Sequence, residues 1–316
     1  MKRAVKKSKD FSQLKVWQEG ELIPLLEAKV HILSHSFGRG SAIFEVLSTH
    51  RTEKGTAVFR LQDHLDRLFR SAQALYMRIP YSRRTLIHAV KQVVLSNHLG
   101  EGLVKIFVFY PELSLEVAPG NKKVSLVIAG FDFQRDISWS KFGEDKFAKA
   151  GISRWRKLSP ETVPVFAKAS GNYLNPMLAK LEVKERGFTA PVLLDTRGYV
   201  AEGATESIFI VKNQKLYTPK LDNILPSITR MSILQLARDL KIPVQEKRIR
   251  AKELLQADEA FFSSTTCKVW HIAQIEDKPL PAPGPVSKKL EEYFQKILAG
   301  KIEKYRHWLT LVKTRS

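Results

Sequence analysis

The chain has 316 residues, 44% of them hydrophobic, which is enough for two ordinary domains with a substantial core. Its 52 Lys and Arg residues outnumber 32 Asp and Glu residues, so the net charge of +20 admits nucleic acid, phosphate-bearing ligands or anionic substrates as partners. The single cysteine excludes an intramolecular disulfide, and we find no apolar run of membrane-span length and no signal-peptide core. We therefore expect a cytoplasmic protein without a membrane span.

The basic residues are spread along the chain, except for a cluster at residues 1–9. We interpret residues 1–10 as a solvated basic tail, because no zinc-ligand spacing, RNA-binding aromatic motif or helix-turn-helix signature accompanies the cluster. We therefore do not expect nucleic acid as a partner. His31 and His35 have no third ligand nearby, so we predict structural histidines and no metal site.

In chain order, residues 15–24 alternate about Glu19-Gly20 and predict a hairpin, and Gly38 and Gly40 mark a loop before an apolar strand. Two helices with one apolar face follow, the second ending at Gly100 as a C-cap. The expected elements of this half are strands at 56–61, 103–110 and 124–129 and helices at about 65–76 and 82–99. A polar stretch at 133–150 is expected to link two domains.

The second half begins with Ile152 to Lys157, and residues 191–210 and 257–266 predict further strands. Ser227 is a plausible N-cap for a helix that runs to Leu240. The free backbone N–H groups of Ile228 and Thr229 would then form an anion site at the start of this helix. Cys267 has no neighbouring histidine, which favours a packed thiol over a nucleophile.

One lysine, Lys168, stands among small and apolar residues in the stretch Phe-Ala-Lys-Ala-Ser-Gly-Asn-Tyr-Leu-Asn at 166–175, just ahead of a helical run. Burial disfavours the ammonium form, so such a lysine can lose its proton near neutral pH and act as a nucleophile toward an aldehyde cofactor. The alternative is a lysine that extends from a half-buried segment to water.

The segment Ala-Lys-Ala-Ser-Gly-Asn-Tyr-Leu-Asn resembles the cofactor-lysine segment of the fold-type IV, or class IV, pyridoxal-phosphate aminotransferases. The branched-chain amino acid aminotransferases are the most similar subgroup, and the resemblance runs from about Val16 to Val312. It implies an α+β fold like that of D-amino acid aminotransferase. The expected parts are a small N-terminal domain at 11–132 and a large C-terminal domain at 151–316 that carries the lysine, with a homodimer completing each active site.

The resemblance also implies a role for each matching residue. Lys168 would hold pyridoxal 5′-phosphate as a Schiff base, Tyr173 would bond the ring oxygen, and Glu202 would bond the pyridine nitrogen. The phosphate would be bound by Arg67 of the Asp-His-Leu-x-Arg-Leu pattern, Ile228, Thr229 and Thr265. The substrate would contact Phe44, Arg39, Lys105 and the backbone of Thr266. Glu206 is expected at the periphery. Without the resemblance, Arg67 would be a surface ion pair with Asp63 or Asp66 and Glu202 a solvated turn acid.

The implied reaction is a ping-pong transfer of the amino group from a branched-chain L-amino acid to 2-oxoglutarate. Arg39 replaces the usual tyrosine and Lys105 the usual arginine of the branched-chain enzymes, and Val46 stands nearby. D-amino acid transamination and aminodeoxychorismate lyase activity therefore stay open on the same fold. A basic nucleic-acid-binding protein is the alternative from another class; it would leave the ordered cofactor motifs unexplained.

Overall fold

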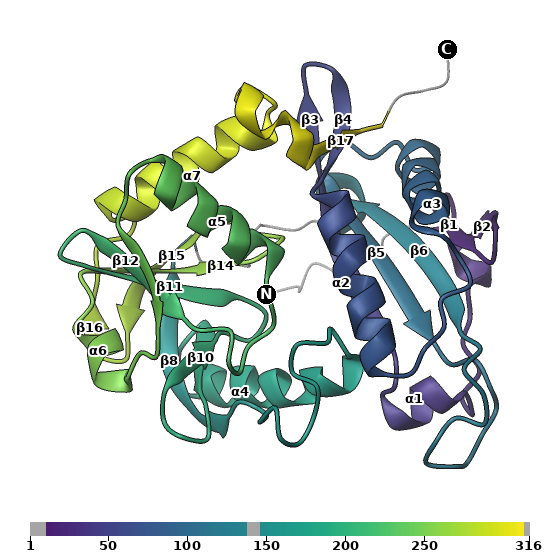
Figure 1. Cartoon of the computed structure of the whole chain (residues 1–316), viewed down its shortest axis with the longest axis horizontal. Coiled ribbons are helices and arrows are strands. Elements are labelled where there is room, and N and C mark those ends of the chain that lie inside the picture. The colour runs from purple at the N-terminus through teal and green to yellow at the C-terminus, as the bar shows by residue number, and fades with distance from the viewer. Residues whose placement is uncertain (1–10, 138–145, 313–316) are drawn as a thin grey trace, which may run out of the picture.

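The structure, a computed structural model, describes residues 11–137 and 146–312, and its helices and strands gather around two β-sheets (Figure 1). The expected α+β class is confirmed. The tail at residues 1–10 lies outside the described residues.

The first sheet has seven antiparallel strands in the order β17-β4-β3-β5-β6-β1-β2. The predicted hairpin joins β1 to β2, and Glu19 and Gly20 both have positive φ in its turn, of 47° and 104°. The strands are β1 (Lys15–Gln18), β2 (Glu21–Pro24), β3 (Ile43–Thr52), β4 (Gly55–Phe59), β5 (Gly102–Phe109), β6 (Ser125–Asp132) and β17 (Leu309–Leu311).

Helices α2 (Leu61–Ala74) and α3 (Arg83–Ser96) pack on this sheet, with Leu65, Leu68 and Val90 in its core. The predicted C-cap at Gly100 is wrong, because α3 ends at Ser96 with Asn97 as its cap. The buried Asn97 side chain bonds both the N–H and the C=O of Lys15 in β1, and the chain reverses at His98, whose φ is 50°. A tertiary contact, rather than a glycine, therefore ends this helix.

The second sheet has nine strands in the order β10-β9-β8-β15-β14-β11-β12-β13, with β16 paired to β15, and contains parallel and antiparallel pairs. Its strands are β8 (Ala148–Arg156), β9 (Ala190–Leu194), β10 (Val200–Glu202), β11 (Ser207–Lys212), β12 (Lys215–Pro219), β13 (Val244–Lys247), β14 (Glu259–Ser263), β15 (Trp270–Ile275) and β16 (Lys278–Pro279).

Helix α4 (Leu174–Glu185) packs on β8 and β9, while α5 (Ile228–Asp239) and α7 (Pro285–Leu298) share an apolar core with β11 and β14 (Figure 1). Shorter helical segments are η1 (Leu25–Glu27), α1 (His35–Arg39), the π-helical turn η2 (Phe133–Ile137), η3 (Ser170–Tyr173), α6 (Ala251–Leu255) and η4 (Glu303–Trp308). No helix among the described residues has the length and apolarity to cross a bilayer.

Two features bear on the expected division into domains. The stretch 133–150, expected as a linker, contains η2 and the first residues of β8. The last strand, β17, leaves the second half of the chain and pairs with β4 of the first sheet. Phe59 at the end of β4 packs with Trp308 and Phe294, so the apolar core under α5 and α7 includes a residue of the first sheet.

Candidate active site

The N-terminal end of β3 holds the lysine segment in place through backbone hydrogen bonds. Phe44 N–H donates to the Lys168 carbonyl at 3.0 Å, and Ser170 N–H donates to the Ala42 carbonyl at 2.7 Å. The Lys168 N–H donates in turn to the Ser71 hydroxyl of α2 at 3.0 Å. The backbone of the lysine is thus fixed from two elements of the first half of the chain.

Two glycines permit this close approach. Gly171 N–H donates to the Gly40 carbonyl at 3.0 Å, and a Cβ on Gly40 would lie 3.2 Å from the Gly171 Cα. Gly40 also has a left-handed φ of 67° at the end of α1, which L side chains rarely adopt. The loop expected at Gly38 and Gly40 is wrong in part, because Gly38 lies within α1 and only Gly40, its C-cap, positions the lysine segment.

The Lys168 side chain is half-buried and donates from Nζ to the Tyr173 hydroxyl at 2.6 Å. Its Nζ also lies 4.8 Å from the centroid of the Phe44 ring. Burial, and then the charge of Arg67, lower the pKa of Lys168 to about 8. Burial, and then the carboxylate of Glu202, raise the pKa of Tyr173, so its hydroxyl keeps its proton. These surroundings favour a lysine that is partly neutral near physiological pH.

Arg67 is buried and forms a two-pronged ion pair with Glu45, Nε to Oε1 at 2.7 Å and Nη2 to Oε2 at 2.8 Å. Surface pairing of Arg67 with Asp63 or Asp66 is excluded, because those residues pair with Arg60 and Arg83. His64 Nδ1 lies 2.7 Å from Glu45 Oε2. Burial alone would raise the pKa of Glu45, but Arg67 and His64 together lower it to about 2.

The remaining hydrogen-bonding group of Arg67 connects it to the start of α5. Its Nη1 donates to the Pro226 carbonyl at 3.0 Å, two residues before α5 begins at Ile228. The predicted N-cap is confirmed, since the Ser227 side chain accepts from Arg230 N–H at 3.2 Å. The backbone N–H groups of Ile228 and Thr229 donate to no described residue, and both residues are buried. Two free donors beside a guanidinium fit a phosphate group.

Glu202 lies at the end of β10 and is buried rather than solvated. Its Oε1 pairs with the buried Lys157 Nζ at 2.5 Å, while Oε2 accepts no hydrogen bond from a described residue. The charge of Glu202 also raises the pKa of Lys168, so the two groups lie within electrostatic reach of each other. A buried carboxylate with one free oxygen can bind a protonated ring nitrogen.

After β14, the chain turns through Thr265 and Thr266, both half-buried. The Thr266 hydroxyl is 2.9 Å from the Ser264 hydroxyl, which in turn is 3.0 Å from the buried Cys267 sulfur. Burial raises the pKa of Cys267 to about 12, which confirms a packed thiol. Lys268 then reaches back to the first sheet, where its Nζ donates to the Ser48 hydroxyl at 2.8 Å.

The expected substrate residues divide into two groups. Lys105 Nζ lies 5.0 Å from the Phe44 ring centroid and 4.4 Å from that of Phe107, and burial and the charge of Lys168 lower its pKa. The centroid of the Phe44 ring therefore lies within 5.0 Å of two lysine amines. Arg39 is exposed and donates to the carbonyls of Leu115 and Glu116 at 2.8 and 3.3 Å. No contact among the described residues joins Arg39 to Lys168.

Several residues of the cluster were not identified from the sequence, namely Glu45, His64, Ser71 and Lys157. Glu45 had the clearest signal, because it is the one acid within the apolar run Ile43–Leu47 and a charge inside a buried strand requires a partner. In the parts of the chain that the structure describes, no group of three His, Cys, Asp or Glu residues could hold a metal ion. Both ring nitrogens of His35 have partners, Ser41 and the Val117 carbonyl.

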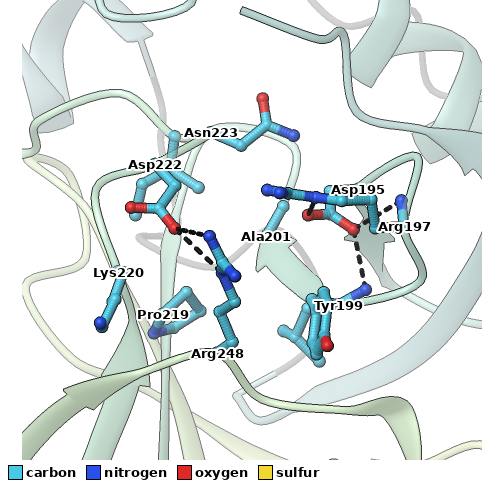
Figure 2. A pocket seen from close by; sticks show the side chains of 11 residues that line it. Asp195, Arg197, Tyr199, Ala201, Pro219, Lys220, Asp222, Asn223 and Arg248 are labelled. Carbon is cyan, nitrogen blue, oxygen red and sulfur yellow. Dashed lines mark hydrogen bonds and ion pairs between the residues drawn. The ribbon is translucent and has the colours of Figure 1, made fainter.

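A small cavity beside β10 is not part of this site (Figure 2). Its volume is about 20 Å³, room for about one water molecule. Figure 2 shows its two arginine side chains directed at acids: Arg248 pairs with Asp222 at 3.0 Å, and Arg197 with Asp195 at 3.6 Å. The cavity is therefore too small for a phosphate-bearing cofactor.

Comparison with known proteins agrees with this geometry. The family model for amino-transferase class IV matches residues 42–275. The chain is 36% identical to a branched-chain-amino-acid aminotransferase of Pseudomonas aeruginosa, over 94% of this chain and 97% of that protein.

Solved structures give the same result. The branched-chain aminotransferase of Thermoproteus uzoniensis, determined with norvaline, has a TM-score of 0.90 and 35% identity, covering 95% of this chain and 99% of that one. The branched-chain amino acid aminotransferase of Thermobaculum terrenum, determined in its pyridoxal-phosphate holo-form, has a TM-score of 0.89 and 28% identity, covering 96% of this chain and 100% of that one. The chain therefore belongs to the class IV aminotransferase family.

Proposed function

We propose that this protein is a pyridoxal-phosphate-dependent aminotransferase that moves the amino group of a branched-chain L-amino acid to 2-oxoglutarate. The observation that carries the proposal is the Lys168 amine, 2.6 Å from the Tyr173 hydroxyl, with its pKa lowered to about 8. The relatives at 31–36% identity are branched-chain enzymes along nearly their whole length, which supports this substrate class.

The cluster provides a suitable group for each part of the cofactor. Arg67, the free N–H groups of Ile228 and Thr229, and Thr265 would bind the phosphate. Glu202 would hold a proton on the ring nitrogen through its free carboxylate oxygen, and the Tyr173 hydroxyl would donate to the ring oxygen. When bound, pyridoxal phosphate supplies an aldehyde that takes up the substrate amine and a ring that accepts the electron pair of the Cα–H bond.

Lys168 would act twice in each half-reaction. A lysine with a pKa of about 8 has a far larger neutral fraction at pH 7.5 than one at its ordinary value of 10.5, so it can act as a nucleophile. Once the substrate amine has displaced it, the same neutral amine can take the proton from the substrate Cα and return it on the cofactor side. An oxo acid leaves, and a second oxo acid reverses the steps, which gives ping-pong kinetics.

Phe44 and Phe107 would provide an apolar wall for a branched side chain, and Lys105 would attract the substrate carboxylate. The backbone N–H of Thr266 would bind the same carboxylate. We propose that Arg39 and the segment it holds act in the active site of a second copy, so that a homodimer completes each site. The cytoplasmic location and the absence of nucleic acid as a partner stay predictions.

The test combines visible absorbance with substrate specificity. Purified protein supplied with pyridoxal phosphate should gain the absorbance band of a lysine-bound cofactor, and L-leucine should bleach it. Lys168→Ala should lose the band and turnover, while Lys180→Ala, a change at an exposed lysine of α4, should keep both. Full turnover by Lys168→Ala would contradict the mechanism. Bleaching by D-alanine alone, or pyruvate release from aminodeoxychorismate, would replace the branched-chain substrate with one of the two alternatives on this fold.

A further inference from the structure

Lys268 lies in the turn between β14 and β15 and is only 3% exposed, although lysine is rarely buried to this degree. Its Nζ donates to the Ser48 hydroxyl of β3 at 2.8 Å, across 220 residues of sequence. The same Nζ donates to the Thr265 carbonyl and lies 5.6 Å from the centroid of the Phe59 ring. A single ammonium group thus joins the first sheet to the turn after β14.

Ser48, the acceptor on β3, is itself fixed within the first half of the chain. It is buried, and its hydroxyl lies 2.9 Å from His50 Nε2. Because Lys268 donates to the hydroxyl oxygen, the hydroxyl proton is available for His50 Nε2. The other ring nitrogen of His50, Nδ1, lies 3.1 Å from Glu101 Oε2. A chain of hydrogen bonds therefore holds the group to which the lysine amine is bound.

The backbone of Lys268 has an unusual conformation. Its φ is 57°, in the left-handed region that residues other than glycine rarely adopt. Its N–H donates to the Ser264 carbonyl at 2.9 Å, and its side chain returns to the carbonyl of Thr265, three residues earlier. Strained backbone of this kind persists where the surrounding structure over-determines it, and the two hydrogen bonds of the amine contribute to that here.

The Thr265 carbonyl belongs to the same peptide unit as the N–H of Thr266, the proposed donor to the substrate carboxylate. This peptide bond is trans, so its C=O and N–H groups point in opposite directions in one plane. A charged donor bound to the oxygen fixes the direction of that plane and, by polarising the amide, strengthens the N–H as a donor. The Thr266 N–H donates to no described residue, so it is available for an anion.

We propose that Lys268 is a positioning residue for the substrate carboxylate. It orients and polarises the peptide between Thr265 and Thr266, so that the Thr266 N–H binds the carboxylate of the amino acid and of the oxo acid. The inference rests on the proposed function, which assigns this carboxylate to Thr266. Lys268 acts through the peptide and not by direct contact, and Ser48 makes β3 a support for the substrate-binding turn.

The test compares two ligands of the protein saturated with pyridoxal phosphate. One, 4-methylpentanoic acid, has the branched body and the carboxylate of leucine without the amine; the other, 3-methylbutylamine, has the body and the amine without the carboxylate. In calorimetric titrations, Lys268→Met should bind the acid about tenfold more weakly than the wild type and the amine within about twofold of it. The KM for L-leucine should rise by a similar factor with kcat nearly unchanged, because the carboxylate contact is present in the ground and transition states alike.

The matched control is Lys278→Met, because Lys278 of β16 also donates from Nζ to a backbone carbonyl, that of Ala257 at 2.6 Å. This variant should bind both ligands as the wild type does. Ser48→Ala keeps the ammonium group and removes its partner on β3, so it tests the same link if Lys268→Met does not fold. It should weaken the binding of the acid about threefold and leave that of the amine unchanged.

Equal weakening of the acid and the amine in Lys268→Met would overturn the proposal in favour of a general loosening of the site. So would equal weakening of the acid in Lys268→Met and Lys278→Met. An acid affinity that stays unchanged in Lys268→Met, or in Ser48→Ala where Lys268→Met does not fold, would also overturn it. A wild type without the absorbance band of a lysine-bound cofactor would instead contradict the proposed function, on which the inference rests.

Discussion

At the scale of single residues, the charge on Lys168 is the clearest conflict between stability and chemistry. Its pKa falls from 10.5 to about 8 because burial and Arg67 disfavour the ammonium form, so the folded state is destabilised by holding a charge at neutral pH. The same effect makes a neutral amine available. Removing the amine should therefore stabilise the cofactor-free protein while it abolishes catalysis.

We predict that Lys168→Met raises the free energy of unfolding of the cofactor-free protein by about 1–3 kcal/mol at pH 7. Between pH 8 and 10.5 the unfolded wild type binds the proton that the folded protein releases, so the wild type gains stability as pH rises. The difference between the two proteins should shrink across that window. Urea denaturation at pH 7 and pH 10 measures it; a constant difference would mean that the gain comes from packing and not from charge.

The buried ion pair of Glu45 with Arg67 leads to a second prediction. Glu45→Gln leaves Arg67 without its carboxylate, and breaking a buried pair in this way costs about 3–5 kcal/mol. The pKa of Glu45 is about 2 in the folded state and 4.5 ordinarily. Its ionised form therefore contributes fully to the free energy of unfolding above pH 4.5, and this contribution is lost as pH falls toward 2. Denaturant unfolding at pH 7 gives the stability, and equilibrium dialysis gives the affinity for pyridoxal phosphate, which should also fall.

Asp66→Asn is the control, because Asp66 lies on the same helix as Arg67 and pairs with Arg83 at 2.7 Å, both side chains being 55% exposed. Loss of this surface pair should lower the free energy of unfolding by less than about 1 kcal/mol and leave the affinity for pyridoxal phosphate unchanged. Similar losses in the two variants would show that the pairing of Glu45 with Arg67 has no special role.

Residues with a local sequence signature could be singled out as candidates from the sequence alone. Lys168 stands out as the one lysine in a run of small and apolar residues, and Ser227 as a cap before a periodic apolar face. Glu45, His64 and Lys157 have no such signature, since each is defined by a partner 19 or more residues away that only the fold brings near. The phosphate-binding role proposed for Arg67 came from its motif, but its buried partner Glu45 could not be predicted from the sequence.

At the scale of elements, α5 presents its first turn to the site, and Ser227 fixes that turn. Its side chain accepts from Arg230 N–H, which leaves the Ile228 and Thr229 N–H groups for a ligand. Ser227→Ala should lower the free energy of unfolding by about 1 kcal/mol, whereas Ser227→Gly should cost only a few tenths. Chemical denaturation of the three proteins tests this; equal losses in Ala and Gly would show that the hydroxyl does not act as a cap.

Element boundaries were less predictable than element types. The helix at 82–99 was expected to end at Gly100, yet α3 ends at Ser96, because the Asn97 side chain bonds both backbone groups of Lys15, 82 residues earlier in the chain. The helical run from Leu174 is confirmed as α4. Its apolar residues Leu174, Met177 and Leu181 are nevertheless half or more exposed. Periodicity marks an apolar face but does not say whether the same chain covers it.

At the scale of the whole molecule, the chain leaves a large apolar surface uncovered beside α1. Two neighbouring segments supply it, joined by the bridge of Ser34 with Leu113 and by the hydrogen bonds of Arg39 to Leu115 and Glu116. We call it the α1 patch; its exposed members are Ile32, Leu33, Phe37, Leu113, Leu115 and Val117. An exposed apolar patch of this kind marks an interface.

We predict that the α1 patch is the contact between two copies and that Leu115→Glu with Val117→Glu separates them. These two side chains are 79% and 83% exposed, so the substitutions should not disturb the fold of a single chain. A carboxylate on each side of a symmetric contact would be buried against apolar residues without a partner. Light scattering should give the mass of two chains for the wild type and of one chain for the variant.

The control variant is Asn213→Asp with Gln214→Glu, which adds the same two negative charges at the exposed turn between β11 and β12 and should remain dimeric.

Activity measurements on the monomeric variant separate two possible roles of the contact. If the segment held by Arg39 completes the active site of the neighbouring copy, the monomeric variant should keep Lys168 and its cofactor band but lose most turnover. A monomer with full turnover would show that each chain holds a complete site, and a dimer that survives both substitutions would place the contact elsewhere, with the exposed face of α4 as the next surface to change.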